Sequence, residues 1–154
     1  MEIKKLQAKT QFEQDKRLSE KFNSFQKLIE ELNKKDLPIE MVGTINMDID
    51  EINNSSESNK EMLNQLNKKQ SKIIKTLEKE LKLVTINHYR KMWLILGMSV
   101  FGIPIGIAIG MSLGNLGLLG IGLPIGLGIG IAVGTAMDKK AKESGKQLNV
   151  ELKD

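Results

Sequence analysis

The sequence predicts an all-α protein, in which a cytoplasmic α-helical coiled-coil hairpin is followed by a hairpin of two transmembrane helices. Three observations predict this fold. The stretch from Met92 to Met137 contains no Asp, Glu, Lys, Arg or His, although 27% of the 154 residues are charged. Apolar residues before this stretch recur at heptad spacing, and glycines within it recur every four residues. A mean hydropathy of -0.22 conceals this division into a polar and an apolar part.

Residues 1–91 are predicted to form the cytoplasmic domain. Its two long helices run from about Ile3 to Lys35 and from about Ser58 to Lys91, the second continuing into the apolar part. Both carry apolar residues at alternating spacings of three and four, which is typical of a coiled-coil seam. The seam residues are Leu18, Phe22, Phe25, Ile29 and Leu32 in the first helix, and Ile74, Leu77, Leu81 and Val84 in the second. Equal lengths favour an antiparallel pair, and parallel pairing between subunits fits the seam equally well.

The segment from Asp36 to Glu57 is too long for a structureless loop in a compact unit. We expect a helix that opens near Pro38, with Met41, Ile45, Ile49 and Ile52 on one side, and a break in the run NNSSES at 53–58. This segment has six acidic residues and no basic one, whereas Ser58–Lys91 has a net charge of +6. The two segments therefore either pair within the chain, or the basic helix meets anionic lipid headgroups.

Residues 92–137 are predicted to form two transmembrane helices, because about 20 apolar residues cross a bilayer core. The spans are about Trp93–Leu113 and about Leu116–Met137, with a turn near 114–116, where Gly114 and Asn115 suit a helix end followed by a reversal. Buried strands are the alternative, since Gly alternates with Ile or Leu after Gly120. Helices are favoured because they satisfy their own backbone in lipid.

The flanks of the apolar part predict its orientation. Aromatic rings favour the lipid–water boundary, and cytoplasmic flanks are rich in Lys and Arg. The predicted membrane-interface residues are Tyr89, Arg90, Lys91, Trp93, Lys139 and Lys140. Both termini are therefore expected in the cytoplasm, with residues 138–154 as a charged cytoplasmic tail.

The two spans repeat one pattern, G-x-P-I-G-x-x-I-G-x-x-x-G, at an offset of 20 residues. Glycines four residues apart lie along one helix face and allow a second backbone to approach closely, either within the hairpin or between subunits. Pro104 and Pro124 are expected to kink their helices and to face each other at similar depth. The predicted helix-packing residues are Gly102, Gly106, Gly110, Gly114, Gly122, Gly126, Gly130 and Gly134.

This pattern, with its Gly-Asn turn and the charged exit from Asp138 to Leu148, resembles the glycine-zipper membrane proteins. The resemblance covers about residues 93–148. It implies a self-associating membrane segment, and some members of this class form channels or toxins.

The sequence offers no catalytic or metal-binding constellation. It has no cysteine and a single histidine, His88, so neither a zinc cluster nor a Ser-His-Asp arrangement is supported. Its glycines match neither nucleotide-binding fingerprint. We therefore expect no enzyme activity, no metal and no cofactor, and the few aromatic residues argue against nucleic acid.

The sequence thus predicts a small, self-associating integral membrane protein, multi-pass, with the lipid bilayer and further copies of itself as partners. The leading interpretation is a gated or conditionally assembled pore, a membrane-permeabilising effector controlled by its cytoplasmic helices. The alternative is a membrane-anchored coiled-coil scaffold that binds a cytoplasmic protein through residues 1–91.

Overall fold

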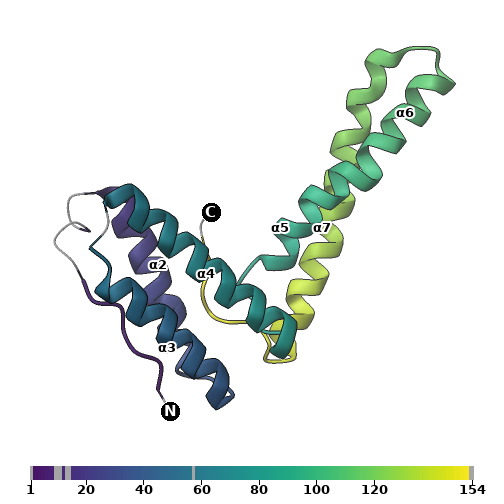
Figure 1. Cartoon of the computed structure of the whole chain (residues 1–154). Coiled ribbons are helices and arrows are strands. Elements are labelled where there is room, and N and C mark those ends of the chain that lie inside the picture. Colours follow the sequence, from purple (N-terminus) through teal and green to yellow (C-terminus); the bar gives the residue numbers. More distant parts are fainter. Residues whose placement is uncertain (1, 9–11, 13–14, 57, 153–154) are drawn as a thin grey trace. The chain divides into compact units, whose positions relative to one another are not determined.

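The computed structural model describes residues 2–8, 12, 15–56 and 58–152, and these residues form helices and their connections with no β-strand (Figure 1). The chain divides into two compact units. The first unit comprises Met1–Val84 together with Leu148–Asp154, and the second comprises Thr85–Gln147. The all-α prediction is confirmed for the described residues.

Three helices form the described body of the first unit: α2 (Lys16–Leu32), α3 (Ile39–Asn54) and α4 (Asn59–Leu81). Local capping explains where two of them begin. The Asp15 carboxylate accepts hydrogen bonds from the backbone N–H groups of Arg17 and Leu18, at 2.9 and 3.2 Å, and so satisfies free donors in the first turn of α2. At the start of α4 the Glu61 carboxylate accepts from the backbone N–H of Ser58 at 3.2 Å.

The segment between the two predicted long helices is itself the helix α3, which begins directly after Pro38. Its predicted apolar face, Met41, Ile45, Ile49 and Ile52, is buried. This confirms the expected third helix. The seam residues of α2 and α4 consequently lie in a core that α3 shares: Leu18, Phe25, Ile29, Leu32 and Leu77 are buried, and Phe22, Ile74 and Leu81 are partly buried against them. The coiled-coil pairing itself stays a prediction.

The predicted first helix, from about Ile3 to Lys35, is wrong at its start. Residues 2–8 are extended, with Ile3 and Leu6 buried in the core. The amide side chains of α3 and of the C-terminal half of α2 hydrogen-bond the backbone of this segment, for instance at Lys4, whose N–H donates to Oδ1 of Asn46 at 2.8 Å. These side chains supply the partners that a helix would otherwise supply from its own backbone.

The predicted second helix, from about Ser58 to Lys91, begins where α4 does but is wrong at its end, because α4 stops at Leu81. Lys82 takes a left-handed conformation with φ 57°, and the N–H of Leu83 donates to the carbonyl of Leu77 at 3.2 Å. This is the usual way of ending a helix, with lysine where glycine is the common residue. Leu83 and Val84 then enter the core.

The second unit is a helical hairpin. Its first arm comprises α5 (His88–Leu96), a π-helical turn η1 (Gly97–Gly102) and α6 (Ile103–Ser112), and after the short η2 (Leu116–Leu118) its second arm is α7 (Leu119–Glu143). Both arms, His88–Ser112 and Leu119–Glu143, are long and apolar enough to cross a membrane. The reversal is the predicted one: Gly114 has φ 66°, and the N–H of Asn115 donates to the carbonyl of Gly110 at 2.9 Å.

The hairpin is inserted into the first unit between Val84 and Leu148. The N–H of Leu148 donates to the carbonyl of Val84 at 2.8 Å, which holds these two ends together. Leu148, Val150 and Leu152 are buried in the core of the first unit. The sequence predicted a charged tail from residue 138, whereas α7 continues to Glu143 and residues 148–152 are part of a folded unit.

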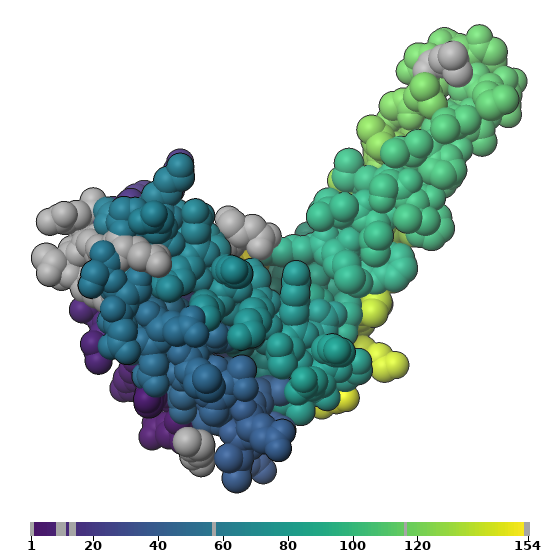
Figure 2. All heavy atoms as spheres, viewed as in Figure 1, coloured from purple at the N-terminus to yellow at the C-terminus, as the bar shows by residue number. Residues whose placement is uncertain are grey.

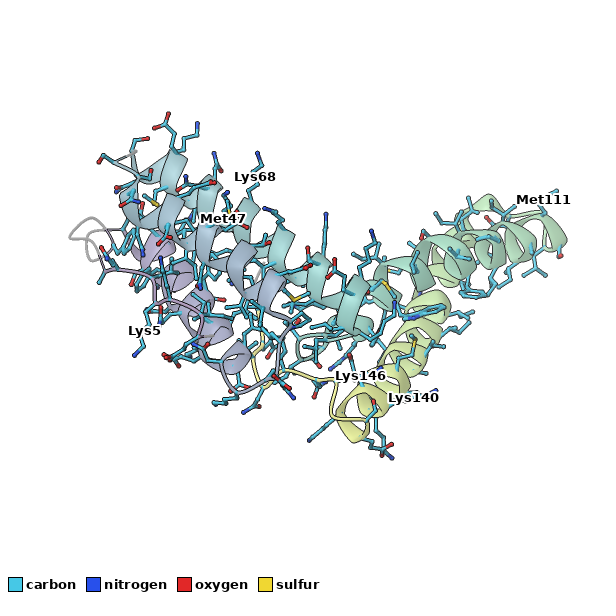
Figure 3. All side chains as sticks on the ribbon, turned by 60° about the horizontal axis from the view of Figure 1, so that its bottom comes forward. Lys5, Met47, Lys68, Met111, Lys140 and Lys146 are labelled. Carbon is cyan, nitrogen blue, oxygen red and sulfur yellow. The ribbon has the colours of Figure 1, made fainter. Side chains whose placement is uncertain are left out.

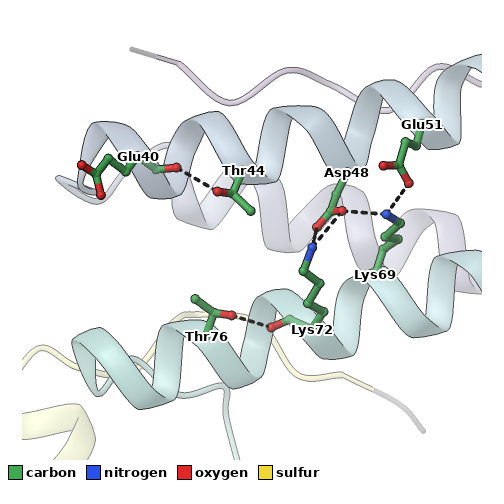
Figure 4. A network of polar contacts seen from close by, with 7 residues as sticks. All are labelled: Glu40, Thr44, Asp48, Glu51, Lys69, Lys72 and Thr76. Atoms are coloured by element: carbon green, nitrogen blue, oxygen red, sulfur yellow. Dashed lines mark hydrogen bonds and ion pairs between the residues drawn. The ribbon is translucent and has the colours of Figure 1, made fainter.

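A cluster of charged side chains joins α3 to α4 (Figure 4). The Asp48 side chain is only 4% exposed. Its carboxylate forms ion pairs with Nζ of Lys69, at 2.7 Å, and with Nζ of Lys72, at 3.0 Å. Lys69 also contacts the Glu51 carboxylate. The acidic segment and the basic helix therefore pair within the chain at these residues.

Opposing effects act on the Asp48 carboxylate. Burial raises its pKa, but the hydrogen bonds from Lys69 and Lys72 outweigh burial and hold the pKa below its ordinary value. For Lys69, burial lowers the pKa, and the hydrogen bonds to Asp48 and Glu51 outweigh it and raise the pKa above its ordinary value. Asp48 therefore stabilises the fold above its ordinary pKa, and this contribution is lost as the pH falls through its lower folded pKa.

We predict that Asp48→Asn lowers the free energy of unfolding of the first unit by about 2 to 3 kcal/mol near neutral pH, because it leaves the nearly buried Lys69 with one carboxylate fewer. The difference from wild type should shrink as the pH falls below about 4. Urea titration followed by far-UV circular dichroism in a mild detergent, at several pH values, measures it. Asp50→Asn is the control, since the Lys4–Asp50 pair is about half exposed, at 54% and 46%, and should contribute under about 1 kcal/mol. Equal effects of the two variants at every pH would contradict this assignment.

Candidate functional site in the apolar hairpin

The two arms of the hairpin meet backbone to backbone at their glycines. A methyl group on Gly122 would overlap the carbonyl oxygen of Gly102 and the backbone of Gly106, and one on Gly126 would overlap Gly97 and Gly102. Farther from the turn, Gly130 lies against the backbone of Trp93, and Gly134 against that of Tyr89 and Arg90. Side chains do not separate the two arms at these positions, because each glycine lies directly against backbone atoms of the opposite arm and leaves no space for a side chain of its own.

Gly97 belongs to the same packed face, although it lies five residues before Gly102 rather than four. The π-helical turn η1 begins at Gly97 and ends at Gly102. Because a π turn closes its hydrogen bonds over five residues, it returns Gly97 to the face that Gly102 occupies. The sequence pattern of four-residue spacing missed this member.

One of the eight glycines expected to pack, Gly114, has another role. Gly110 is buried, and Gly114 has no atom within 4 Å of an added methyl group and instead forms the turn. Gly120 and Gly128 likewise have nothing within 4 Å, since they lie on the other side of α7. The remaining six expected positions lie against the backbone of the opposite arm.

Gly122 packs between Gly102 and Gly106, so Pro104, which lies between those two glycines in the chain, is near the level of Gly122. Pro124 is two residues farther from the turn, which separates the prolines by about 3 Å along the hairpin. The π turn η1 lies directly before Pro104, where the missing N–H and the pyrrolidine ring disturb the regular helix. In η1 the Ser99 hydroxyl donates to the carbonyl of Ile95 at 3.0 Å.

Asp138 links the two arms at the end of the hairpin that is opposite the turn. Its carboxylate accepts hydrogen bonds from the backbone N–H groups of Tyr89, at 3.0 Å, and Arg90, at 2.9 Å. These are free donors in the first turn of α5, whose preceding residue, Asn87, makes no side-chain cap. A residue of α7 thus caps α5 and adds a negative charge at the positive end of its dipole. Sequence analysis missed this role; the available signal was a lone acid directly after the uncharged stretch.

Charged and aromatic residues gather at that same end. The indole N–H of Trp93 donates to the sulfur of Met137 at 2.9 Å, and Lys139 and Lys140 are exposed. Figure 3 shows Lys140 at this end of α7 and Met111 beside the turn at the other end. The predicted interface residues Tyr89, Arg90, Trp93, Lys139 and Lys140 therefore all lie at one end of the hairpin.

The two arms form the green part of the surface in Figure 2, and large apolar side chains are exposed on them. Ile95 is 68% exposed and Met111 is 71% exposed. Of the 18 most apolar consecutive residues in each arm, only 22% are buried. The packed interior holds glycines, and the exposed surface holds Ile, Leu, Val, Phe and Met. This is the reverse of the arrangement that water imposes on a protein surface.

Comparison with protein-family models, with curated proteins and with solved structures finds no match to this chain.

We predict that Gly126→Ala destabilises the hairpin by about 1 to 3 kcal/mol, because the nearest atoms are backbone atoms that cannot rotate away. Gly128→Ala, two residues along the same helix, should leave it unchanged or stabilise it by up to about 1 kcal/mol through helix propensity. Fluorescence of Trp93, the single tryptophan, during titration from a mild detergent into dodecyl sulfate reports the transition. Similar shifts for the two variants would show that the packed face is unimportant.

Proposed function

We propose that this protein is an integral membrane protein whose hairpin anchors the helical first unit at the cytoplasmic face of a bilayer. The first unit binds a protein partner there, so the chain acts as a membrane-anchored scaffold or adaptor. The observation that carries the membrane assignment is the exposed apolar surface of both arms, which water would disfavour and lipid would accept.

The dimensions and charges of the hairpin suit this role. Each arm has 25 residues, or about 37 Å of helix, against a hydrocarbon core of about 30 Å. Arg90, Lys91, Lys139 and Lys140 lie at one end of the two arms, and the turn has no charge. The first unit is formed by the chain before and after the hairpin, so it joins the hairpin at this basic end. The positive-inside rule then predicts that the first unit is on the cytoplasmic side.

An anchor explains the glycine contacts better than a preformed channel. The packed glycine faces are used within one hairpin, and the resemblance to glycine-zipper proteins is accounted for by that packing. Hydroxyl and amide side chains within the uncharged stretch are confined to Ser99, Ser112, Asn115 and Thr135. A passage lined by Ile and Gly tends to exclude water and to stay closed.

A conditionally assembled pore is the second candidate, and one observation favours it. Small residues recur every four positions on the exposed side of α7: Gly120, Pro124, Gly128, Ala132 and Ala136. Gly120 and Gly128 have open space above them. In lipid such a face allows a second helix to approach, so copies of the hairpin would associate here rather than through the packed face.

We predict that Ile125→Lys prevents stable membrane insertion, because a lysine near the middle of a span costs about 2.5 to 3.5 kcal/mol in lipid. Ile125 is 41% exposed, so in water the same change would be nearly neutral. Resistance to alkaline carbonate extraction after expression in cells measures insertion, and Ile125→Leu is the matched control. Wild type that is fully extracted, or an Ile125→Lys variant as resistant as wild type, would exclude the membrane anchor.

Dye release from liposomes containing the purified protein separates the two candidates. The anchor predicts tight liposomes and a monomer by chemical cross-linking. The pore predicts release by a defined oligomer, abolished by Gly128→Leu with Ala132→Leu and retained in the Ile125→Leu control. Release that persists in the double leucine variant would mean that this face of α7 does not assemble the pore.

A further inference from the structure

Residues 2–7 lie between α2 and α3 as an extended chain whose backbone is held by amide side chains. On the α3 side, Asn46 accepts from the N–H of Lys4 at 2.8 Å and donates to the carbonyl of Glu2 at 3.2 Å. Asn53 repeats this arrangement three residues farther along the segment. It accepts from the N–H of Gln7 at 2.9 Å and donates to the carbonyl of Lys5 at 3.2 Å. Each amide thus binds one N–H and one C=O two residues apart.

The α2 side mirrors this arrangement. Asn33 accepts from the N–H of Ile3 at 2.8 Å and donates to the carbonyl of the same residue at 3.1 Å. Gln26 accepts from the N–H of Leu6 at 3.2 Å. The extended segment is therefore held by backbone contacts on two sides, and on each side they recur every three residues, as the period of a polyproline II chain requires.

The spacing of these amides along the helices matches the spacing of the backbone groups that they bind. Asn46 and Asn53 are seven residues apart, and so are Gln26 and Asn33. Seven residues of helix rise about 10.5 Å, and three residues of extended chain span about 10 Å. Both pairs accordingly contact positions three apart in the segment, Lys4 and Gln7 on one side, Ile3 and Leu6 on the other.

Side-chain selection is confined to a few positions. Ile3 and Leu6 are buried, at 3% and 6% exposure. The Lys4 ammonium contacts both carboxylate oxygens of Asp50, at 2.9 and 2.7 Å. Lys5 is exposed and points away from the helices (Figure 3). The segment held between α2 and α3 therefore has the pattern apolar, lysine, exposed residue, apolar at residues 3–6.

We propose that this groove between α2 and α3, named here the amide groove, is a peptide-binding site that residues 2–7 occupy as an intramolecular ligand. Its partner is an extended segment of another protein with the pattern apolar-Lys-x-apolar, which binds by displacing residues 2–7. The helices that carry the amides have buried faces of their own against α4, so the walls of the groove do not depend on the segment alone. The proposal names the partner surface of the scaffold and rests on that function for its biological role.

The test uses the full chain in mild detergent and an acetylated, fluorescein-labelled peptide with the sequence of residues 2–8, followed by fluorescence anisotropy. The variant Ile3→Asp with Leu6→Asp releases the chain's own segment. We expect this variant to bind the peptide at least tenfold more tightly than wild type does, because no intramolecular ligand competes. Adding Asn46→Ala and Asn53→Ala should weaken binding at least tenfold.

Peptide variants supply the matched controls. Changing Lys5→Ala in the peptide should leave affinity unchanged, changing Lys4→Ala should weaken it several-fold, and changing both Ile3→Asp and Leu6→Asp should abolish binding. A released chain that keeps α2 and α3 protected in hydrogen exchange but binds no peptide would overturn the proposal. So would equal affinity for the Lys5→Ala and Lys4→Ala peptides.

If the released variant does not fold, wild type still tests the idea. Excess unlabelled peptide should accelerate hydrogen exchange at the chain's own amides of Ile3, Lys4, Leu6 and Gln7, and no acceleration up to the solubility limit would overturn it. A wild-type dimer that exchanges this segment between copies and resists excess peptide would assign the groove to a second copy, against the proposal. Peptide binding in detergent requires no bilayer, so its failure and a failure of membrane insertion are distinguishable.

Discussion

Direct backbone contact between the two arms of the hairpin is the constraint on which the second unit depends. Gly97 on one arm and Gly122, Gly126 and Gly130 on the other leave no room for a methyl group. Helices that pack this closely lose little apolar surface to each other, so their large side chains remain outside. In water that exposure would be unfavourable, whereas in lipid it costs nothing and close packing supplies the attraction. This packing therefore supports the proposed location of the hairpin in a bilayer.

The same constraint explains two departures from regular helix geometry. Pro104 interrupts the hydrogen bonding of the first arm, and the π turn before it restores Gly97 to the packed face. At the open end, Asp138 satisfies the N–H groups of Tyr89 and Arg90. The first N–H groups of a helix have no partner within it, so a capping residue from the opposite arm both satisfies these donors and joins the two arms.

In the first unit, contacts between polar side chains supplement the apolar core. Its acidic α3 and basic α4 neutralise each other around Asp48 and Lys69. Four amide side chains, two on α3, one on α2 and one at the C-cap of α2, hold an extended segment whose Ile3 and Leu6 are buried in the core. Because amides bind backbone rather than side chains, this arrangement can accept other segments of the same pattern.

The sequence alone determined the uncharged stretch, its division into two helices, the turn at Gly114 and the helix beginning after Pro38, because each follows from local composition and spacing. Only the tertiary structure decided that residues 2–8 are extended, that α4 ends at Lys82, that Gly97 packs and that Asp138 caps α5. Each of these depends on a partner distant in the chain: amides of α2 and α3, the core that receives Leu83, or the opposite arm of the hairpin. Heptad and glycine periodicity report which face of a helix is apolar or small, and they do not report what that face meets.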